Sequence, residues 1–320
     1  MIKYIIKRLL HMIPVILLIS ICIFTIIKLT PGNPVGTRLD PKATPEQKQM
    51  EKERLGLDKP MYIQYIMWLE RSVHGDFGES YIYKRPVSDV IKPFIKNTFI
   101  LNVGVFLLSF LVSIPIGIVC AVKKYSKTDN FWTVFSLFGI SMPSFFFGLL
   151  LIYVFSVKLK ITPISGMIEA GTRTVGFGRA IEVSKHLILP GLVLLIGSLA
   201  GLVRYTRNGM LEVLNQDYIR TARSKGLSEK VVIYRHAFRN ALIPIITILG
   251  FSIPGLFSGA VILESTFNWP GIGRIMIDAV NARDYNMLMA VMMLFAILTL
   301  LGNLLADIGY AMVDPRIKVD

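Results

Sequence analysis

The sequence contains little charge for its length. Only 18% of its 320 residues are Asp, Glu, Lys or Arg, whereas 53% are hydrophobic. Soluble domains usually contain about 25% charged and about 45–50% apolar residues. These proportions exclude an ordinary soluble enzyme. They also exclude an intrinsically disordered chain, which would have low hydrophobicity and high charge.

The motifs that mark catalytic, metal and nucleotide sites are also missing. The only two cysteines, Cys22 and Cys120, lie in apolar stretches, which argues against a disulfide framework. The four histidines are scattered, and neither H-E-x-x-H nor paired C-x-x-C occurs. No G-x-x-x-x-G-K-[S/T] or G-x-S-x-G is present either. We therefore expect this chain to bind no metal and no cofactor and to have no catalytic residues.

The apolar residues gather in segments long enough to cross a membrane, which takes about 20 residues as a helix. The basic start that precedes the first segment resembles a signal peptide, but no small-x-small cleavage site follows, so we interpret this segment as a retained helix. The sequence thus predicts an all-α polytopic membrane protein with six transmembrane helices. The predicted spans are 9–29, 99–122, 131–157, 187–203, 241–263 and 287–306.

The distribution of basic residues predicts the orientation. With the N-terminus inside, the inner segments hold 16 Lys and Arg in 67 residues, against 18 in 121 residues outside. Lys and Arg concentrate in cytoplasmic loops, so both termini are expected in the cytoplasm. The net charge of +14 is then explained by the membrane, without nucleic acid as a partner. The expected parts are a tail and first span at 1–29, an extracytoplasmic loop at 30–98, a core at 99–310 with a cytoplasmic loop at 204–240, and a cytoplasmic tail at 311–320.

The first outer loop is expected to be structured. Thr44, Pro45 and Gln47 have the pattern of a capping box with proline at the first helical position, and Gly56 would end that helix. A second, aromatic helix is expected to begin at Pro60. These helices either cap the bundle or form a docking site for an external partner, and the sequence leaves both open.

The predicted spans contain almost no ionisable residues in their middles. Ion-coupled carriers usually mark their pathway with buried charges. If the protein moves a solute, we therefore expect the energy to come from elsewhere. The spans contain helix breakers and small residues instead, among them Pro143, Pro254, and Gly197 and Gly201 one turn apart. Such a glycine pair permits close helix approach, either within the chain or between subunits.

The cytoplasmic loop at 204–240 is the most informative segment. Asp217 is positioned to cap a short helix, Arg223 and Lys225 lie in its last turn, and Gly226 supplies a left-handed C-terminal position. Ser228 is positioned to cap a second helix that continues towards the fifth span. The pattern predicts a helix–turn–helix elbow along the membrane surface. The alternative is that its basic residues have no specific function and only satisfy the positive-inside rule.

The elbow resembles the conserved loop of membrane subunits of binding-protein-dependent ABC importers. The general pattern of that loop is E-A-A-x3-G-x9-I-x-L-P, and Ala222 and Gly226 match it. The departures are Arg220, Thr221, His236, Phe238 and Arg239. Residues 217–227 and 236–244 resemble instead the version that is typical of the dipeptide, oligopeptide and nickel branch.

The resemblance extends along the whole chain. Its further elements are Thr30-Pro-Gly-Asn-Pro34, Gly75-Asp-Phe-Gly78-Glu-Ser80, Arg283-Asp-Tyr285 and Asp314-Pro-Arg316. The long loop after the first span resembles the first of the two permeases that such systems use. The resemblance therefore implies the fold of a type I ABC importer permease in the cytoplasmic (inner) membrane of a bacterium or archaeon.

The resemblance also implies partners and site residues. A second permease would complete the pathway, two ATPase subunits would use ATP and Mg, and a substrate-binding protein would dock outside. The expected ATPase contact consists of Asp217, Tyr218, Arg220, Ala222, Arg223, Ser224, Lys225, Gly226, His236, Arg239 and Asn240. Phe267 and Trp269 place rigid apolar groups beside Glu264 at the end of the fifth span, so we expect these three residues in the pathway or outer gate.

Several functions stay open on the sequence alone. The implied solute is a dipeptide or oligopeptide, with nickel or a metal chelate as the alternative in the same architecture. A secondary transporter with unmarked coupling is a more distant alternative. A membrane enzyme or scaffold would need a polar catalytic pair within a span, and the predicted spans contain none.

Overall fold

The structure, a computed structural model, describes residues 2–30, 44–54, 56–172, 174–258 and 260–313. Within these ranges the chain is helical apart from its loops and one isolated bridge between Glu79 and Pro86. The sequence motifs at 31–34 and 314–316, and the part of the predicted tail from 314 onwards, lie outside the described residues.

Among the described residues, five helical stretches are long and apolar enough to cross a membrane, and a bent helix pair makes a sixth if it is counted as one span. This agrees with the predicted number of spans. Four of the stretches lie in single helices: α1 (Ile2–Leu29), α5 (Val87–Val122), α8 (Gly176–Leu214) and α15 (Tyr285–Val313).

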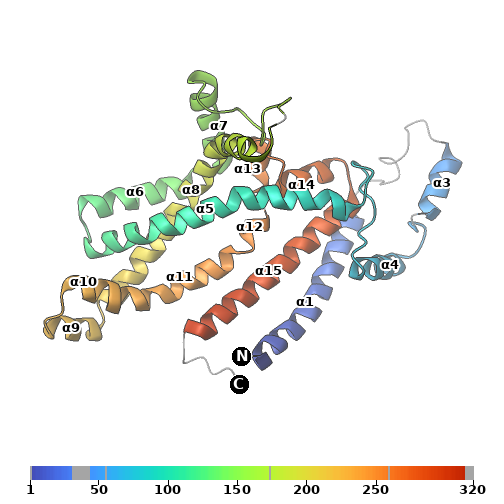
Figure 1. Cartoon of the computed structure of the whole chain (residues 1–320). Coiled ribbons are helices and arrows are strands. Elements are labelled where there is room, and N and C mark those ends of the chain that lie inside the picture. Colours follow the sequence, from blue (N-terminus) through green and yellow to red (C-terminus); the bar gives the residue numbers. More distant parts are fainter. Residues whose placement is uncertain (1, 31–43, 55, 173, 259, 314–320) are drawn as a thin grey trace.

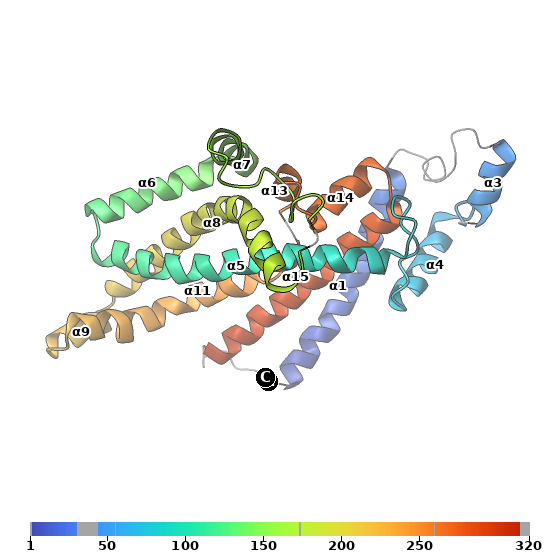
Figure 2. The same cartoon turned by 45° about the horizontal axis from the view of Figure 1, so that its top comes forward.

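The long helices form one bundle (Figures 1 and 2). α5 packs along α8, α6 (Lys127–Ser141) packs on α8, and α1 packs on α15. An ion pair of 2.9 Å between Arg8 and Asp307 joins the beginning of α1 to the last part of α15. We call the end of the bundle where α9 (Asp217–Ser224) projects the elbow end. The opposite end carries α4 (Met61–Val73) and α14 (Ile272–Asn281).

The third predicted span, 131–157, is not one helix. It breaks into α6 and the pair α7 (Ser144–Leu151) and η1 (Ile152–Lys158), with a bend of 101°. The break falls at Met142, whose backbone is extended (ψ 122°) because the following Pro143 disfavours helical geometry at the preceding residue. The sequence contains this breaker, but hydropathy alone predicted a continuous helix.

Two other predicted spans also differ. The fifth, 241–263, is divided among α11 (Phe238–Ser252), α12 (Gly255–Ser258) and α13 (Val261–Thr266), with Pro254 between the first two. The fourth was the shortest prediction, yet α8 is the longest described helix because it continues beyond the apolar run at both ends. The ends of α8 are polar, so hydropathy does not predict that they are helical.

The predicted helices of the first outer loop are confirmed. In α3 (Pro45–Arg54), the backbone N–H of Gln47 donates to Thr44 Oγ1 and the Gln47 side chain accepts from the Thr44 N–H, which is the expected capping box. Gly56 has the left-handed backbone (φ +66°) expected after the helix. In α4, Trp68 is buried and packs with Tyr65 against Phe24 of α1. The aromatic face of α4 therefore packs on the protein's own first span.

A buried aspartate joins two distant loop motifs at this end of the bundle. The Asp284 carboxylate accepts hydrogen bonds from Ser80 Oγ at 2.5 Å and from the Tyr81 N–H at 2.7 Å. Its other oxygen accepts from the Met287 N–H at 3.2 Å, in the first turn of α15. Asp284 therefore caps α15 and holds the loop that precedes α5 against it.

We predict that Asp284→Ala destabilises the protein by about 2–3 kcal/mol, because three backbone N–H groups and a hydroxyl lose their acceptor in a largely buried site. Thermal unfolding of the purified protein in detergent measures this loss. Asp278→Ala is the matched control. Asp278 is partly exposed, and its ion pair with Arg274 is weak because the two atoms are 3.9 Å apart. Equal unfolding temperatures for the two variants would contradict the role of Asp284.

Candidate functional site

The elbow is a short helix, a tight turn and a longer continuous helix. α9 is followed by Gly226, and the chain then passes through α10 (Glu229–Val231) and the π-helical η2 (Val232–Ala237) directly into α11. Figure 1 shows α9 and α10 projecting from one end of the bundle. The helical path from α10 to the middle of the bundle is therefore unbroken.

The turn has the predicted geometry. Gly226 has φ +75°, its N–H donates to the Arg223 carbonyl at 2.9 Å, and the Leu227 N–H reaches the Ala222 carbonyl at 3.4 Å. This is the glycine-terminated pattern expected at a helix C-terminus. Arg223 and Glu229 form an ion pair of 2.8 Å across the turn.

The predicted caps of the elbow need correction. Asp217 is the first residue of α9 rather than its cap, because Gln216 holds the extended cap position. The Asp217 carboxylate still lies in the first turn, where the helix dipole favours negative charge, and is 3.5 Å from Arg220. Ser228 does hold the cap position of α10, but its side chain makes no capping hydrogen bond.

α9 is fixed to the bundle through its apolar face. Ile219 is fully buried and Ala222 is 6% exposed. Both belong to one buried cluster with Ile118 of α5, Met210 of α8 and Val232 of η2. Ala222, predicted as a contact residue, therefore faces the bundle. Ile219 was not predicted, although its place three residues before Ala222 puts both side chains on one helix face.

The other predicted contact residues lie on the outside or at the base of the elbow. Asn240 donates to the His236 carbonyl at 2.9 Å in the turn where η2 passes into α11. Desolvation raises the pKa of the Tyr218 phenol, and a hydrogen bond with Asn240 acts in the opposite direction. His236 is half-buried. The exposed members are Asp217, Tyr218, Arg220, Arg223, Ser224, Lys225, Gly226, Arg239 and Asn240.

A buried ion pair fastens the base of the elbow. Arg207 of α8 donates from Nε and Nη2 to the two carboxylate oxygens of Asp129 of α6, at 2.5 Å and 2.8 Å. Asp129 is 1% exposed and also accepts from the Tyr125 N–H at 2.9 Å. Such bidentate geometry fixes orientation as well as distance. No local sequence pattern indicates this pair, because its partners are 78 positions apart.

Glu264 has a definite place at the opposite end of the bundle. Its carboxylate is fully buried and accepts from Thr98 Oγ1 at 2.8 Å and from the Gly273 N–H at 2.7 Å. It thus occupies the N-terminus of α14, where unpaired N–H groups favour an anion. A Cβ at Gly271 would collide with this carboxylate, so the close approach requires glycine.

Phe267 and Trp269 are buried next to Glu264. The Trp269 indole N–H donates to the Asn97 carbonyl at 3.0 Å, and the Phe267 ring lies against Gly148 of α7. Together with Glu264, these residues brace α13 and α14 against α5 and α7. Their predicted role in the pathway or outer gate stays a prediction, and none of the three lines the cavity described next.

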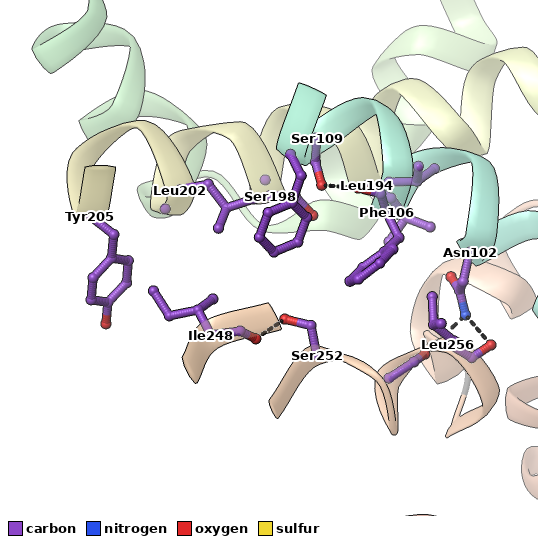
Figure 3. Close-up of a pocket in the computed structure, with 15 residues that line it drawn as sticks. Asn102, Phe106, Ser109, Leu194, Ser198, Leu202, Tyr205, Ile248, Ser252 and Leu256 are labelled. Carbon is purple, nitrogen blue, oxygen red and sulfur yellow. Dashed lines mark hydrogen bonds between the residues drawn. The ribbon is translucent and has the colours of Figure 1, made fainter. Parts of the chain in front are cut away.

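An open cavity of about 390 Å³ lies between α5, α8, α11 and α12 (Figure 3). Its lining is apolar with isolated neutral polar groups, and it contains no Asp, Glu, Lys, Arg or His. Gly197 and Gly201 form part of its wall, with open space where their Cβ atoms would be. The glycine pair therefore packs against no other helix within the described part of the chain.

The polar groups of this cavity are mostly held by their own helices. Ser109 and Ser252 donate to the carbonyls of Phe106 and Ile248, at 2.8 Å and 2.7 Å. Asn102 donates to the Gly255 carbonyl at 3.1 Å, where the break between α11 and α12 exposes the backbone. The sequence indicated only the glycines and the nearby Pro254, since scattered serines in apolar spans have no distinctive spacing.

The sequence matches two families of transport components. "Binding-protein-dependent transport system inner membrane component" matches residues 113–319, and the corresponding N-terminal family matches residues 1–102. The chain is 45% identical to the oligopeptide transport system permease protein AppB of Bacillus subtilis, over 99% of this chain and 100% of the relative. It is 36% identical to the glutathione transport system permease protein GsiC of Escherichia coli K12, over 99% of both chains.

One solved structure has a similar fold. An inward-facing structure of the MetNI methionine ABC transporter aligns with a TM-score of 0.52, covering 70% of this chain and 96% of that chain. The sequence identity is 14%, so this likeness concerns the fold alone. It agrees with the predicted type I ABC importer permease fold.

We predict that Arg207→Ala destabilises the protein by about 3–5 kcal/mol, because Asp129 is left buried without a counter-ion. The double variant Asp129→Ala, Arg207→Ala should lose less than the single variant. Thermal unfolding in detergent measures both. Lys92→Ala, which breaks an exposed pair with Asp89, is the control and should change stability by less than about 1 kcal/mol. Additive losses for Asp129→Ala and Arg207→Ala would show that the pair is not coupled.

Proposed function

The chain belongs to the family of binding-protein-dependent transport system inner membrane components, and from this premise we propose that it is the first permease subunit of an ATP-driven importer of peptides. The observation that carries this proposal is the elbow: a short helix with an exposed polar surface, anchored by two buried side chains and continuous with a helix of the bundle. The names of the relatives favour a peptide as the solute.

The geometry of the elbow suits a mechanical contact with an ATPase. The exposed residues of α9 are available to a groove on a partner, whereas Ile219 and Ala222 transmit its displacement to α5 and α8. We propose that two ATPase subunits bind at the elbow end, which places this end and both termini in the cytoplasm. This chain then hydrolyses no ATP and binds no cofactor, because ATP and Mg are used by those partners.

The open cavity supports a role in the pathway. A second, homologous permease would close its open side, while Gly197 and Gly201 keep the cavity wall free of side chains within the described residues. The uncharged lining offers no fixed counter-charge, so peptides with different side chains would pass with similar ease. Selection of the solute then lies mainly with the extracytoplasmic substrate-binding protein.

The alternative functions find less support. A bare nickel ion prefers nitrogen, sulfur or carboxylate ligands, and the cavity lining offers no His, Cys, Asp or Glu. A chelate would not need such ligands and stays the alternative solute. A proton- or sodium-driven carrier would be expected to have an ionisable residue in this cavity.

The end opposite the elbow is the proposed docking surface of the substrate-binding protein. It carries α4 and the braced pair of α13 and α14. Asp284 and Glu264 fix the loops there to the ends of α15 and α14. Docking at this surface would therefore move helices rather than only rearrange a loop.

We predict that Gly226→Val uncouples ATP hydrolysis from uptake, because a β-branched residue disfavours the positive φ of the turn by about 1–2 kcal/mol. Gly226→Asn is the matched variant. It should retain most activity, since asparagine tolerates this backbone and no atom lies within 4 Å of the added Cβ. Uptake and ATPase activity of the reconstituted complex are measured together. Equal transport by both variants, together with the absence of cross-links from Ser224 to the ATPase, would remove the coupling role.

We predict that Gly201→Leu reduces peptide uptake at least tenfold without preventing assembly, because the side chain enters the cavity where nothing now lies within 4 Å of a Cβ. Gly104→Leu is the control, since Gly104 also has free space but does not line the cavity. Normal uptake by an assembled Gly201→Leu complex would place the pathway elsewhere.

A further inference from the structure

A second cavity, of about 320 Å³, lies between α5, α6 and α8 near the elbow end. It is separate from the first cavity and shares no lining residue with it. The residues that line it are Cys120, Trp132, Thr133, Ser136, Leu137, Val203, Arg204, Arg207 and Asn208. Apart from Arg207, whose ion pair with Asp129 fastens the base of the elbow, none of these residues has a role in the elbow or in the proposed pathway.

Two of the polar groups in the lining have no partner in the described part of the chain. Ser136 is 3% exposed, and its buried hydroxyl makes no hydrogen bond there. Such a group loses its bonds to water without compensation, which usually costs about 1–3 kcal/mol. The exposed Arg204 forms no ion pair within the same ranges, whereas Arg207 is neutralised by Asp129. The cavity therefore presents one positive charge that is not compensated locally.

The residues around the cavity are of the kinds expected at the lipid headgroup boundary. Arg204 lies about one helical turn from Arg207, on the side away from the elbow. The neighbouring surface of α6 exposes the apolar side chains of Phe131, Val134 and Phe138, as expected for contact with lipid tails. Trp132 lines the cavity beside them, and tryptophan is enriched where headgroups meet acyl chains.

We propose that this cavity binds the phosphate group of a membrane phospholipid. Arg204 pairs with the phosphodiester, and the Ser136 and Thr133 hydroxyls and the Asn208 amide are available to donate to its oxygens. The acyl chains then lie along the apolar face of α6. An anionic headgroup such as phosphatidylglycerol is preferred, because a choline headgroup would bring a second uncompensated cation next to Arg204. This inference depends only on the chain lying in a membrane and not on the proposed solute.

The test is native mass spectrometry of the complete purified complex, with lipid added back after delipidation. We expect wild type to retain one phosphatidylglycerol more tightly than phosphatidylcholine. Arg204→Gln should weaken retention roughly tenfold, in line with the loss of one hydrogen-bonded charge. Ser136→Ala should weaken retention of the lipid several-fold. Lys127→Gln is the control, because it removes a positive charge from the first turn of α6 and Lys127 does not line the cavity.

The outcomes separate the sources of phosphate. Soluble glycerol phosphate should not displace the lipid at millimolar concentration, and if it does, the site takes free phosphate and the lipid assignment is wrong. Equal retention by wild type, Arg204→Gln and Ser136→Ala overturns the site. If Arg204→Gln fails to assemble, Ser136→Ala and Arg204→Lys decide: unchanged retention in Ser136→Ala and equal affinity for the two lipids in Arg204→Lys overturn the proposal.

Discussion

The burial of Ile219 and Ala222 against α5, α8 and η2 is the contact that attaches the elbow to the bundle. An isolated helix of eight residues is not stable in water, so α9 owes its structure to this contact and to the turn at Gly226. Burying a large apolar side chain contributes about 1.5–3 kcal/mol, which is enough to hold such a short helix in place. The same contact attaches α9 firmly to the bundle.

The remaining fastenings follow one physical pattern. Glu264 and Asp284 are buried carboxylates at the N-termini of α14 and α15, where backbone N–H groups satisfy them. Asp129 is satisfied differently, because it accepts two hydrogen bonds from the Arg207 guanidinium. Each carboxylate ties segments far apart in sequence, so the interrupted helices of the bundle keep a fixed arrangement. Next to the open cavity the backbone carbonyl of Gly255, at one of these breaks, accepts a hydrogen bond from the Asn102 side chain.

The sequence predicted features that depend on local patterns and missed those that depend on distant contacts. Thr44, Gln47 and Gly226 act through neighbouring backbone groups, and their roles could be predicted from short spacings. Pro143 indicates the bend between α6 and α7, but the mean hydropathy of the whole segment does not register a single proline. The pairing of Asp129 with Arg207 and the burial of Glu264 could not be predicted, because no local rule brings their partners together. The lining of the open cavity was missed for the same reason.

The central claim is that the elbow moves as one body with the ends of α5 and α8 against which Ile219 and Ala222 pack. The most direct measurement is the distance between spin labels at the exposed residues Ser224 and Lys124 in the reconstituted complex, without nucleotide and with ATP bound. A second pair at Leu108 and Leu249, both exposed on α5 and α11, reports whether the bundle itself moves. The account predicts that ATP changes the second distance and leaves the first within the width of its distribution. A change in the first distance while the second stays constant would contradict the claim, because the elbow would then be a hinged loop.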